Sequence, residues 1–255
     1  MMPPVSSVPP VSSVPSVPSG EVRRFGDRAL LIGTGDAPGA RALGAELGAR
    51  LRGTDAEVVC GLATVAVVVR DPVVELADLD APVRRALQVA AALRVGVVAT
   101  LPPGTAAGGE PGRGGERVVT IPCTFDGPDL DEVAERAACT SDEVVALLTA
   151  RPLTVAVVGF SPGFAYLDGL PDALRAVPRR PRPRPVVPAG AVAVANGYAA
   201  VYPTASPGGW QLVGRTGFPL FSVSAPPYAA LAPGDRVRFR VAHAGDPAEP
   251  GVGRG

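Results

Sequence analysis

Apolar and polar residues follow two different patterns along the chain, and the first pattern occupies residues 21–100. Short β-like runs there are mixed with apolar residues at helical spacing. A Gly26-Asp27 pair interrupts the first β-like run and predicts a turn, and Gly53 predicts the end of a helix. The predicted elements are two strands within 22–33, a helix over 38–53, a strand over 64–70 and a helix over 81–94. This mixture predicts a small N-terminal α/β domain.

The second pattern follows a predicted strand at 117–123 and two short predicted helices. One helix begins at Pro128; the other follows Thr140, with Glu143 at the capping-box spacing. From Leu153 onward, short β-rich runs alternate with Gly/Pro turns about every ten residues. These runs are 153–160, 191–195, 199–203, 210–214, 219–223 and 236–241. This spacing predicts an antiparallel barrel or sandwich over 117–242, and the whole chain is of the α+β class.

Three segments have the composition of connectors or tails. Residues 1–20 are a Pro/Ser/Val repeat and predict a disordered, polyproline-leaning tail. They carry neither a basic start nor a continuous apolar run, so we do not expect a signal peptide. Residues 101–116 are rich in Gly and Pro and predict a linker. Residues 243–255 predict a flexible tail.

Composition and charge narrow the function. Lysine plus arginine equals aspartate plus glutamate, 24 against 24, so no overall field favours nucleic acid or an anionic membrane. The chain contains no lysine, which excludes a P-loop clamp and a Schiff base. Its one histidine, His243, follows the last predicted strand. Three widely spaced cysteines suit a reducing cytoplasm and form no metal motif. We therefore expect no metal, and a component of an enzyme rather than a complete catalyst.

Three motifs in the second region contain residues that could bind a ligand or a partner. The loop GFSPGFAYLDG (159–169) places Phe164 and Tyr166 beside a Pro-Gly turn; it also suits a loop packed by aromatics. The segment PRRPRPRPVVPAG (178–190) holds Arg179 and Arg184 on a stiff, extended backbone, and it also suits a solvated arm. Because prolines are confined to sheet edges, this segment is expected along an edge or a cleft wall.

The third motif is SPGGWQLVGRTG (206–217), which contains the only tryptophan of the chain. Gly208 and Gly209 could turn backbone N–H groups toward an anion, beside a flat wall from Trp210 and a guanidinium fork from Arg215. The plain alternative is a hairpin turn with a core tryptophan. Together the three motifs predict one cleft on a β scaffold. No residue is assigned as the catalytic acid, base or nucleophile.

The order of these motifs, followed by PGD-x-VRF, resembles the family of the 5-oxoprolinase B subunit over about residues 21–241. This family includes allophanate hydrolase subunit 1 and the sporulation-kinase inhibitors. The resemblance implies a cyclophilin-like barrel and a role in an ATP-dependent enzyme that opens 5-oxo-L-proline to L-glutamate. It implies the C subunit of that enzyme as the direct partner, the A subunit as a further one, and ATP bound by the assembly. The implied substrate-binding or subunit-interface positions are Phe164, Tyr166, Arg179, Arg184, Ser206, Gly208, Gly209, Trp210, Arg215 and Thr216.

Three positions depart from the pattern of the resembled family. Leu148 stands where histidine is common, Ala165 where proline is common and Ala191 where serine is common. Two other functions remain open at this stage. The chain could be a binding module that inhibits a sensor histidine kinase, or subunit 1 of an allophanate hydrolase or urea carboxylase-type enzyme.

Overall fold

A computed structural model describes residues 19–26, 28–54, 56–69, 117–224, 226–243 and 246 of the chain. The chain falls into two compact units, Met1–Val95 and Gly96–Gly255. The predicted helix 81–94, the predicted linker 101–116 and most of the predicted tails 1–20 and 243–255 lie outside the described residues. No helix in the described ranges is both long enough and apolar enough to cross a membrane.

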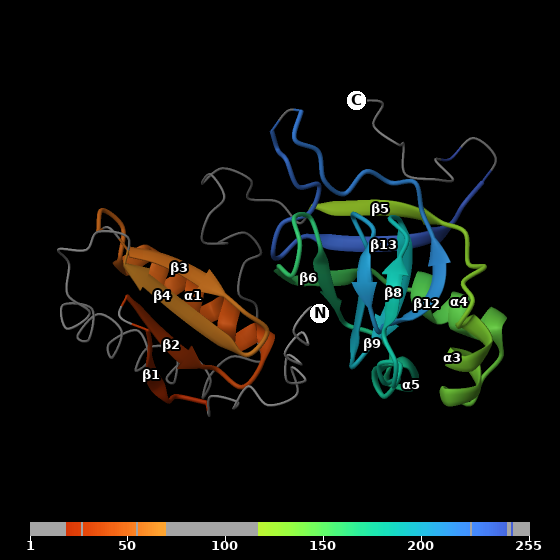
Figure 1. Ribbon diagram of the computed structural model, residues 1–255, viewed down its shortest axis with the longest axis horizontal. Coiled ribbons are helices and arrows are strands. Elements are labelled where there is room, and N and C mark those ends of the chain that lie inside the picture. Colours follow the sequence, from red (N-terminus) through yellow and green to blue (C-terminus); the bar gives the residue numbers. More distant parts are fainter. Residues whose placement is uncertain are drawn as a thin grey trace, which may run out of the picture. The chain divides into compact units, whose positions relative to one another are not determined.

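In its described residues, the first unit is an antiparallel sheet of four strands with helix α1 packed against it (Figure 1). Its elements are β1 (Val22–Phe25), β2 (Ala29–Gly33), α1 (Ala37–Arg50), β3 (Ala56–Cys60) and β4 (Thr64–Val69). The strand order is β1-β2-β4-β3. The predicted turn joins β1 to β2, with Phe25 opposite Ala29. The sequence did not predict β3.

Helix α1 begins one residue before the predicted start at 38 and ends at Arg50, three residues before the predicted end at 53. The carboxylate of Asp36 caps it by accepting a hydrogen bond from the Gly39 N–H at 2.7 Å. Leu43 and Leu47 are buried against the sheet, because residues four apart lie on one helix face. Gly53 follows the helix with a φ of +82°, a conformation that glycine adopts without steric cost.

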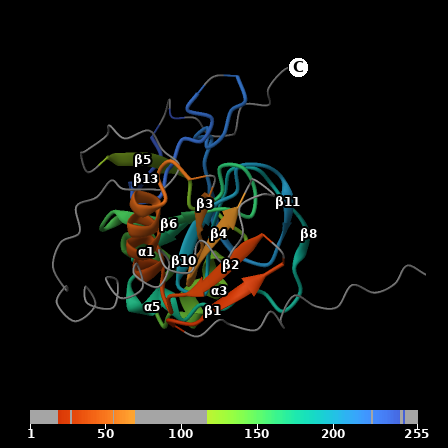
Figure 2. The same ribbon diagram turned by 90° about the vertical axis from the view of Figure 1, so that its left-hand side faces the viewer.

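The second unit is built on a sheet of seven strands that curls into a barrel (Figures 1 and 2). Its helices are α3 (Leu130–Arg136), α4 (Ser141–Thr149) and α5 (Asp172–Arg175). Its strands are β5 (Val118–Cys123), β6 (Leu153–Val158), β7 (Ala165–Asp168), β8 (Arg184–Val187), β9 (Ala191–Ala195), β10 (Tyr198–Val201), β11 (Ser206–Gly208), β12 (Gln211–Arg215) and β13 (Arg236–Val241). The order in the large sheet is β12-β9-β10-β7-β6-β13-β5, and β8 pairs with β11 in a separate ribbon.

The two ends of the seven-stranded order meet. Thr124, directly after β5, exchanges two backbone hydrogen bonds of 2.8 Å with Arg215 at the end of β12. Two glycines allow this approach. A Cβ on Gly214 would lie 2.5 Å from the Thr124 carbonyl oxygen, and one on Gly127 would overlap the backbone of Leu212. The sheet is therefore a nearly closed barrel, one of the two architectures that the turn spacing predicts.

Two details of the barrel differ from the prediction. The pairing is not antiparallel throughout, because β5 and β13 run parallel from Val118 opposite Arg236 to Cys123 opposite Val241. The predicted strand at 219–223 does not form. Only Phe221 makes an isolated bridge, with Ala229, since this apolar run packs as a loop. The sequence also did not predict β7, β8 and β11 as strands, although β8 does lie at an edge.

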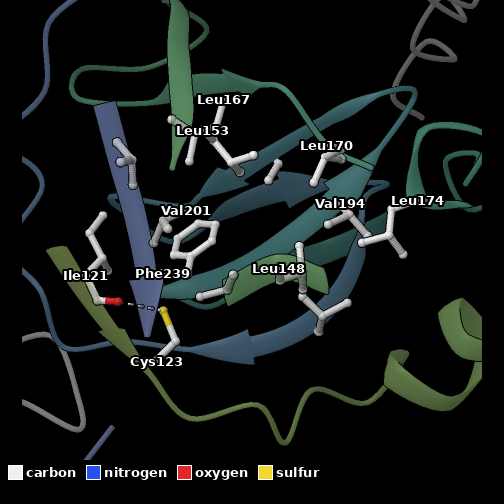
Figure 3. Packing of buried hydrophobic residues seen from close by; sticks show 14 of the residues in the cluster. Ile121, Cys123, Leu148, Leu153, Leu167, Leu170, Leu174, Val194, Val201 and Phe239 are labelled. Carbon is white, nitrogen blue, oxygen red and sulfur yellow. Dashed lines mark hydrogen bonds between the residues drawn. The ribbon is translucent and has the colours of Figure 1, made fainter. Parts of the chain in front are cut away.

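The barrel core is aliphatic, with Phe239 among its members (Figure 3). Ile121, Leu153 and Val194 are buried there. Leu148 of α4 also packs into this core and is fully buried, so the position where histidine is common in the resembled family is filled by an apolar side chain. Ala165 belongs to the same core. Helix α4 carries the predicted capping box between Thr140 and Glu143.

Candidate functional site

A second cluster of buried side chains lies on the opposite face of strand β9. Val192 and Val194 point into the barrel core, whereas Ala191, Ala193 and Ala195 belong to this other cluster, because successive side chains of a strand alternate. The three alanines are small and leave room for large rings. Phe164, Tyr202 and Trp210 are buried against them, and Tyr166 and Tyr198 pack at the margin. We call these five rings the aromatic cluster.

Phe164 is the centre of the aromatic cluster. Its ring centroid lies 5.0 Å from that of Tyr166, 5.3 Å from that of Tyr202 and 5.9 Å from that of Trp210, each pair edge to face. Tyr166 and Trp210 also contact edge to face, at 5.7 Å. Edge-to-face pairs contribute about 0.5–1.5 kcal/mol each beyond area burial. The predicted loop 159–169 and the predicted Trp motif therefore meet in one packed group, in which Phe164 and Trp210 are buried, as the alternatives of an aromatic-packed loop and a core tryptophan predict.

Arg179 provides the cationic edge of the aromatic cluster. Its Cζ lies 6.0 Å from the centroid of the Trp210 ring, and the residue is exposed. Burial raises the pKa of the Tyr166 and Tyr202 hydroxyls, and the charge of Arg179 opposes this rise in both pKa values. Tyr166 is half-buried. An exposed guanidinium beside a phenol and an indole can bind an anion that carries a flat or apolar body.

A buried carboxylate holds the arginine-proline segment in place. Asp129 is 3% exposed, and its Oδ1 accepts hydrogen bonds of 2.7 Å from Arg180 Nη1 and from Arg184 Nη2. Its Oδ2 accepts one of 2.7 Å from the Leu212 N–H. Although Asp129 occupies the N-cap position of α3, its side chain makes no cap hydrogen bond. One carboxylate thus ties α3, the arginine-proline segment and β12 together; we call it the Asp129 clamp.

The Asp129 clamp changes the interpretation of Arg184. The sequence places Arg184 in a ligand or interface cleft beside Arg179. In the structure its guanidinium binds Asp129, and Nη1 lies 3.5 Å from the Trp210 carbonyl oxygen. Arg184 therefore supports the backbone of Trp210. Arg180, which the sequence did not single out, has the same role, because its N–H donates to the Gly209 carbonyl at 2.7 Å.

Of the two glycines before Trp210, Gly208 is required by packing. A Cβ on Gly208 would overlap the hydroxyl oxygen of Tyr202, so only glycine allows β11 to pass over this ring. Gly209 has more space, since a Cβ there would lie 3.7 Å from Pro183 Cγ, and its carbonyl accepts from Arg180. Ser206 pairs with Val187 in the β8–β11 ribbon. The sequence predicts that both glycines approach a ligand closely, but Gly208 makes its close approach to the protein's own Tyr202 side chain, and Gly209 makes none of this kind.

Arg215 and Thr216 lie away from the aromatic cluster. The sequence predicts that Arg215 reaches the same cleft as Trp210, but the extended strand β12 separates them by five residues, about 16 Å. Arg215 Nε instead lies 3.0 Å from Asp126 Oδ2 in an exposed ion pair. Thr216 is buried, and its Oγ1 accepts a hydrogen bond from the Phe218 N–H at 3.0 Å. Arg215 belongs to the closure of the barrel, and the Thr216 N–H donates to the Gly190 carbonyl at 2.8 Å.

Sequence reasoning missed several residues around the site. Asp129, Arg180, Tyr198 and Tyr202 all contact members of the aromatic cluster or the clamp. The alternation in AAVYP was a usable signal for Tyr202. No local signal pairs Asp129 with arginines more than 50 residues away. Among the described residues, no three His, Cys, Asp or Glu side chains gather as a metal site would require.

Comparison with known proteins agrees with the motif order. The family of the carboxyltransferase domain, subdomains C and D, matches residues 21–231. The 5-oxoprolinase B subunit of Bacillus subtilis (strain 168) is 41% identical over 126 residues, which are 48% of this chain and 52% of that protein. The 5-oxoprolinase B subunit of Escherichia coli O157:H7 is 43% identical over 126 residues, 48% of this chain and 57% of that protein.

The fold also has a solved counterpart. The crystal structure of TTHA0988 superposes with a TM-score of 0.66 at 32% identity, covering 88% of this chain and 41% of that one. The matches span about half the length of the two curated relatives. The resemblance to the 5-oxoprolinase B subunit that the motifs indicate is thereby confirmed. Since the family match covers most of the sequence, the chain belongs to the family of the carboxyltransferase domain, subdomains C and D.

Proposed function

We propose that this chain is the B subunit of a multi-subunit, ATP-dependent 5-oxoprolinase, which opens 5-oxo-L-proline to L-glutamate. The observation that carries the proposal is the identity of 41–43% to proteins named as this 5-oxoprolinase component. The absence of lysine and the position of the only histidine, after the last strand, agree with a subunit that needs partners. The partners are the C subunit, in direct contact, and the A subunit. We further propose that the barrel is cyclophilin-like and that the complex is cytoplasmic.

In this proposal the aromatic cluster is the part of the substrate site that this chain supplies. 5-Oxoproline carries a carboxylate, and an acyl-phosphate intermediate would carry more negative charge. The Arg179 fork binds such an oxygen, with the Tyr166 hydroxyl as a second donor. The Trp210 indole and the Phe164 ring are buried behind this pair, Trp210 against Arg179 and Phe164 against Tyr166. Arg180, Arg184 and Asp129 hold the arginine-proline segment in position.

ATP belongs to the assembled complex in this proposal. A nucleotide triphosphate needs several cationic or backbone donors around its phosphates. Of the site's three arginines, Arg180 and Arg184 are bound to Asp129, which leaves Arg179 as the one exposed fork beside the aromatic cluster in the described residues. The single guanidinium of Arg179 does not balance the negative charge of a triphosphate. We therefore assign the nucleotide to a site that the partner proteins provide or complete.

The test is reconstitution. The chain, co-expressed and purified with the A and C subunits of its source organism, should release ADP only when 5-oxoproline is added. The purified chain alone should neither hydrolyse ATP nor open the lactam. Turnover by the chain alone, or a reconstituted complex without 5-oxoproline-dependent ADP release, would refute the proposal.

Site variants extend the test within the complex. Arg179→Gln should lower turnover at least about tenfold, which corresponds to roughly 1.4 kcal/mol of transition-state stabilisation. Arg182→Gln is the matched control, because Arg182 is an exposed arginine of the same segment. Equal activity of the two variants would place the substrate elsewhere, whatever the outcome for the complex.

A further inference from the structure

Gln211 is a fully buried polar residue directly after Trp210, with an exposed fraction of 0%. Leu212 packs on the side of the aromatic cluster, so the Gln211 side chain, one position earlier in β12, lies on the other face of the strand. Its amide Nε2 donates long hydrogen bonds to the Pro178 carbonyl oxygen, at 3.4 Å, and to Glu132 Oε1, at 3.5 Å. Both oxygens are acceptors, so the amide nitrogen faces them.

The backbone is held on both sides of Arg179. The Pro178 carbonyl, which accepts from Gln211, belongs to the peptide unit that precedes Arg179. The Arg180 N–H belongs to the peptide unit that follows Arg179, and it donates to the Gly209 carbonyl at 2.7 Å. Because a peptide unit is planar, these two hydrogen bonds orient both units that flank the Arg179 Cα. They thereby set the direction in which the Arg179 side chain leaves the backbone.

This direction leads the Arg179 side chain over the Trp210 ring. Residues 178–180 run beside residues 209–211 in the opposite direction, so Arg179 stands opposite Trp210. Its Cζ lies 6.0 Å from the ring centroid. Within the described part of the chain, no hydrogen bond or ion pair holds the Arg179 guanidinium. The position of this cation therefore depends on its backbone and not on a partner for its head group.

Folding alone does not account for an amide at position 211. No donor among the described residues reaches Gln211 Oε1, and a buried polar atom without a partner lowers stability. A methionine or leucine would fill a similar volume without this cost. Pro178 is exposed, so its carbonyl can bond to water when the amide is removed. The amide therefore contributes little to stability, and its effect is on the orientation of the backbone before Arg179.

We infer that Gln211 is a positioning residue, which directs the Arg179 guanidinium over the aromatic cluster so that it can bind an anionic ligand. The hydrogen bonds at the Pro178 carbonyl and the Arg180 N–H set this direction together. The Asp129 clamp anchors the segment behind them, through the Arg180 side chain. In the proposed function the anion is the substrate, and the inference rests on that function for this assignment. The competing interpretation is that Gln211 only fills space between α3 and β12.

The titration of Tyr166 in the full, purified chain reports where the Arg179 charge lies. Burial raises the pKa of Tyr166 and the Arg179 charge opposes this rise, whereas the Arg184 charge also lowers the pKa of Tyr202. The Tyr166 curve is the difference between phenolate titrations with and without Tyr166→Phe. Gln211→Met removes the amide at similar volume, and Gln211→Leu takes its place if the methionine variant fails to fold.

We expect Gln211→Met to raise the Tyr166 pKa by at least about half of the rise that Arg179→Gln causes. In the Arg179→Gln background, Gln211→Met should cause no further rise, because a positioning residue acts through the group that it positions. Leu148→Met, the control, is a similar exchange in the barrel core and should leave the curve unchanged. An unchanged curve for Gln211→Met whatever its stability, an equal rise without Arg179, or an equal rise in the control would overturn the inference.

Activity separates this inference from the proposed function. In the reconstituted complex, Gln211→Met should lower 5-oxoproline-dependent ADP release at least about threefold, because a misplaced binding group loses part of its effect. If the titrations change as expected while the wild-type complex is inactive, the positioning stands and the function is wrong. If the wild-type complex is active and Gln211→Met changes neither the titration nor turnover, the positioning is wrong and the function stands. A changed titration with unchanged turnover would overturn the assignment of the anion as substrate.

Discussion

Gly208 lies against the ring of Tyr202 so closely that no other residue fits at its position. A Cβ there would be 2.9 Å from Tyr202 Cζ and 3.0 Å from Cε1, and would overlap the hydroxyl oxygen. Tyr202 is almost fully buried and cannot move aside, because Phe164 packs on it at 5.3 Å. This contact explains the first glycine of the Gly-Gly pair that precedes the only tryptophan of the chain.

Gly208→Ala should therefore destabilise the protein by about 1–3 kcal/mol, the usual cost of forcing extra volume into a packed site. Gly209→Ala is the control, because the nearest atom would be 3.7 Å from its Cβ, an ordinary contact. Urea unfolding followed by the fluorescence of Trp210 measures both. Equal stability of the two variants would contradict the packing role.

A second prediction concerns the Asp129 clamp. Asp129→Asn leaves the partly buried Arg180 and Arg184 without their shared carboxylate, which should cost about 2–3 kcal/mol. Asp126→Asn removes a carboxylate from the exposed pair with Arg215 and should cost under about 1 kcal/mol. The two variants carry the same chemical change, so thermal unfolding of both isolates the effect of burial. A smaller loss at 129 than at 126 would show that the clamp does not hold the segment.

Local features of this fold could be predicted from sequence. The capping box at Thr140 and Glu143 is a four-residue pattern, and both of its hydrogen bonds form. The hairpin at Gly26 is equally local. The run PLFSV at 219–223 shows the limit, because its pattern is that of a strand. The fold leaves it as a loop with Val223 in solvent, and only Phe221 forms a bridge, to Ala229.

The candidate site could be predicted only in part. Phe164, Tyr166 and Trp210 pack into one cluster on the side of the sheet opposite the barrel core, and the burial of Phe164 and Trp210 matches the alternatives of an aromatic-packed loop and a core tryptophan. Arg215 lies elsewhere because closeness in sequence is not closeness in space, and an extended strand carries it away from Trp210. Asp129 could not be found, because its partners lie 51 to 83 residues further on.

Cys123 should be the least reactive of the three thiols. Burial in the barrel core raises its pKa to about 12, so the thiolate that alkylating agents attack is scarce at pH 8.5. Because the folded pKa is raised, the stabilisation by this thiol is fully present below its unfolded value of about 8.5. It is lost as the pH rises toward 12. Mass spectrometry after brief iodoacetamide labelling should find Cys123 unmodified while Cys139 reacts. Rapid labelling of Cys123 in the folded protein would contradict its place in the core.

Arg179 should control the titration of the neighbouring tyrosines. Burial raises the pKa of Tyr166 and Tyr202, and the Arg179 charge opposes this rise, so Arg179→Gln should raise both pKa values further. A raised pKa of a phenol means that its contribution to stability is present below about pH 10, its unfolded value, and is lost as the pH rises through the folded value. Phenolate absorbance near 295 nm, followed from pH 9 to 12, measures the shift, and the substitutions Tyr166→Phe and Tyr202→Phe assign it. Arg182→Gln, the exposed control in the same segment, should leave the curve unchanged. If Arg179→Gln also leaves it unchanged, the guanidinium does not lie over the aromatic cluster in solution, and Arg179 loses its place as the anion-binding group of the site.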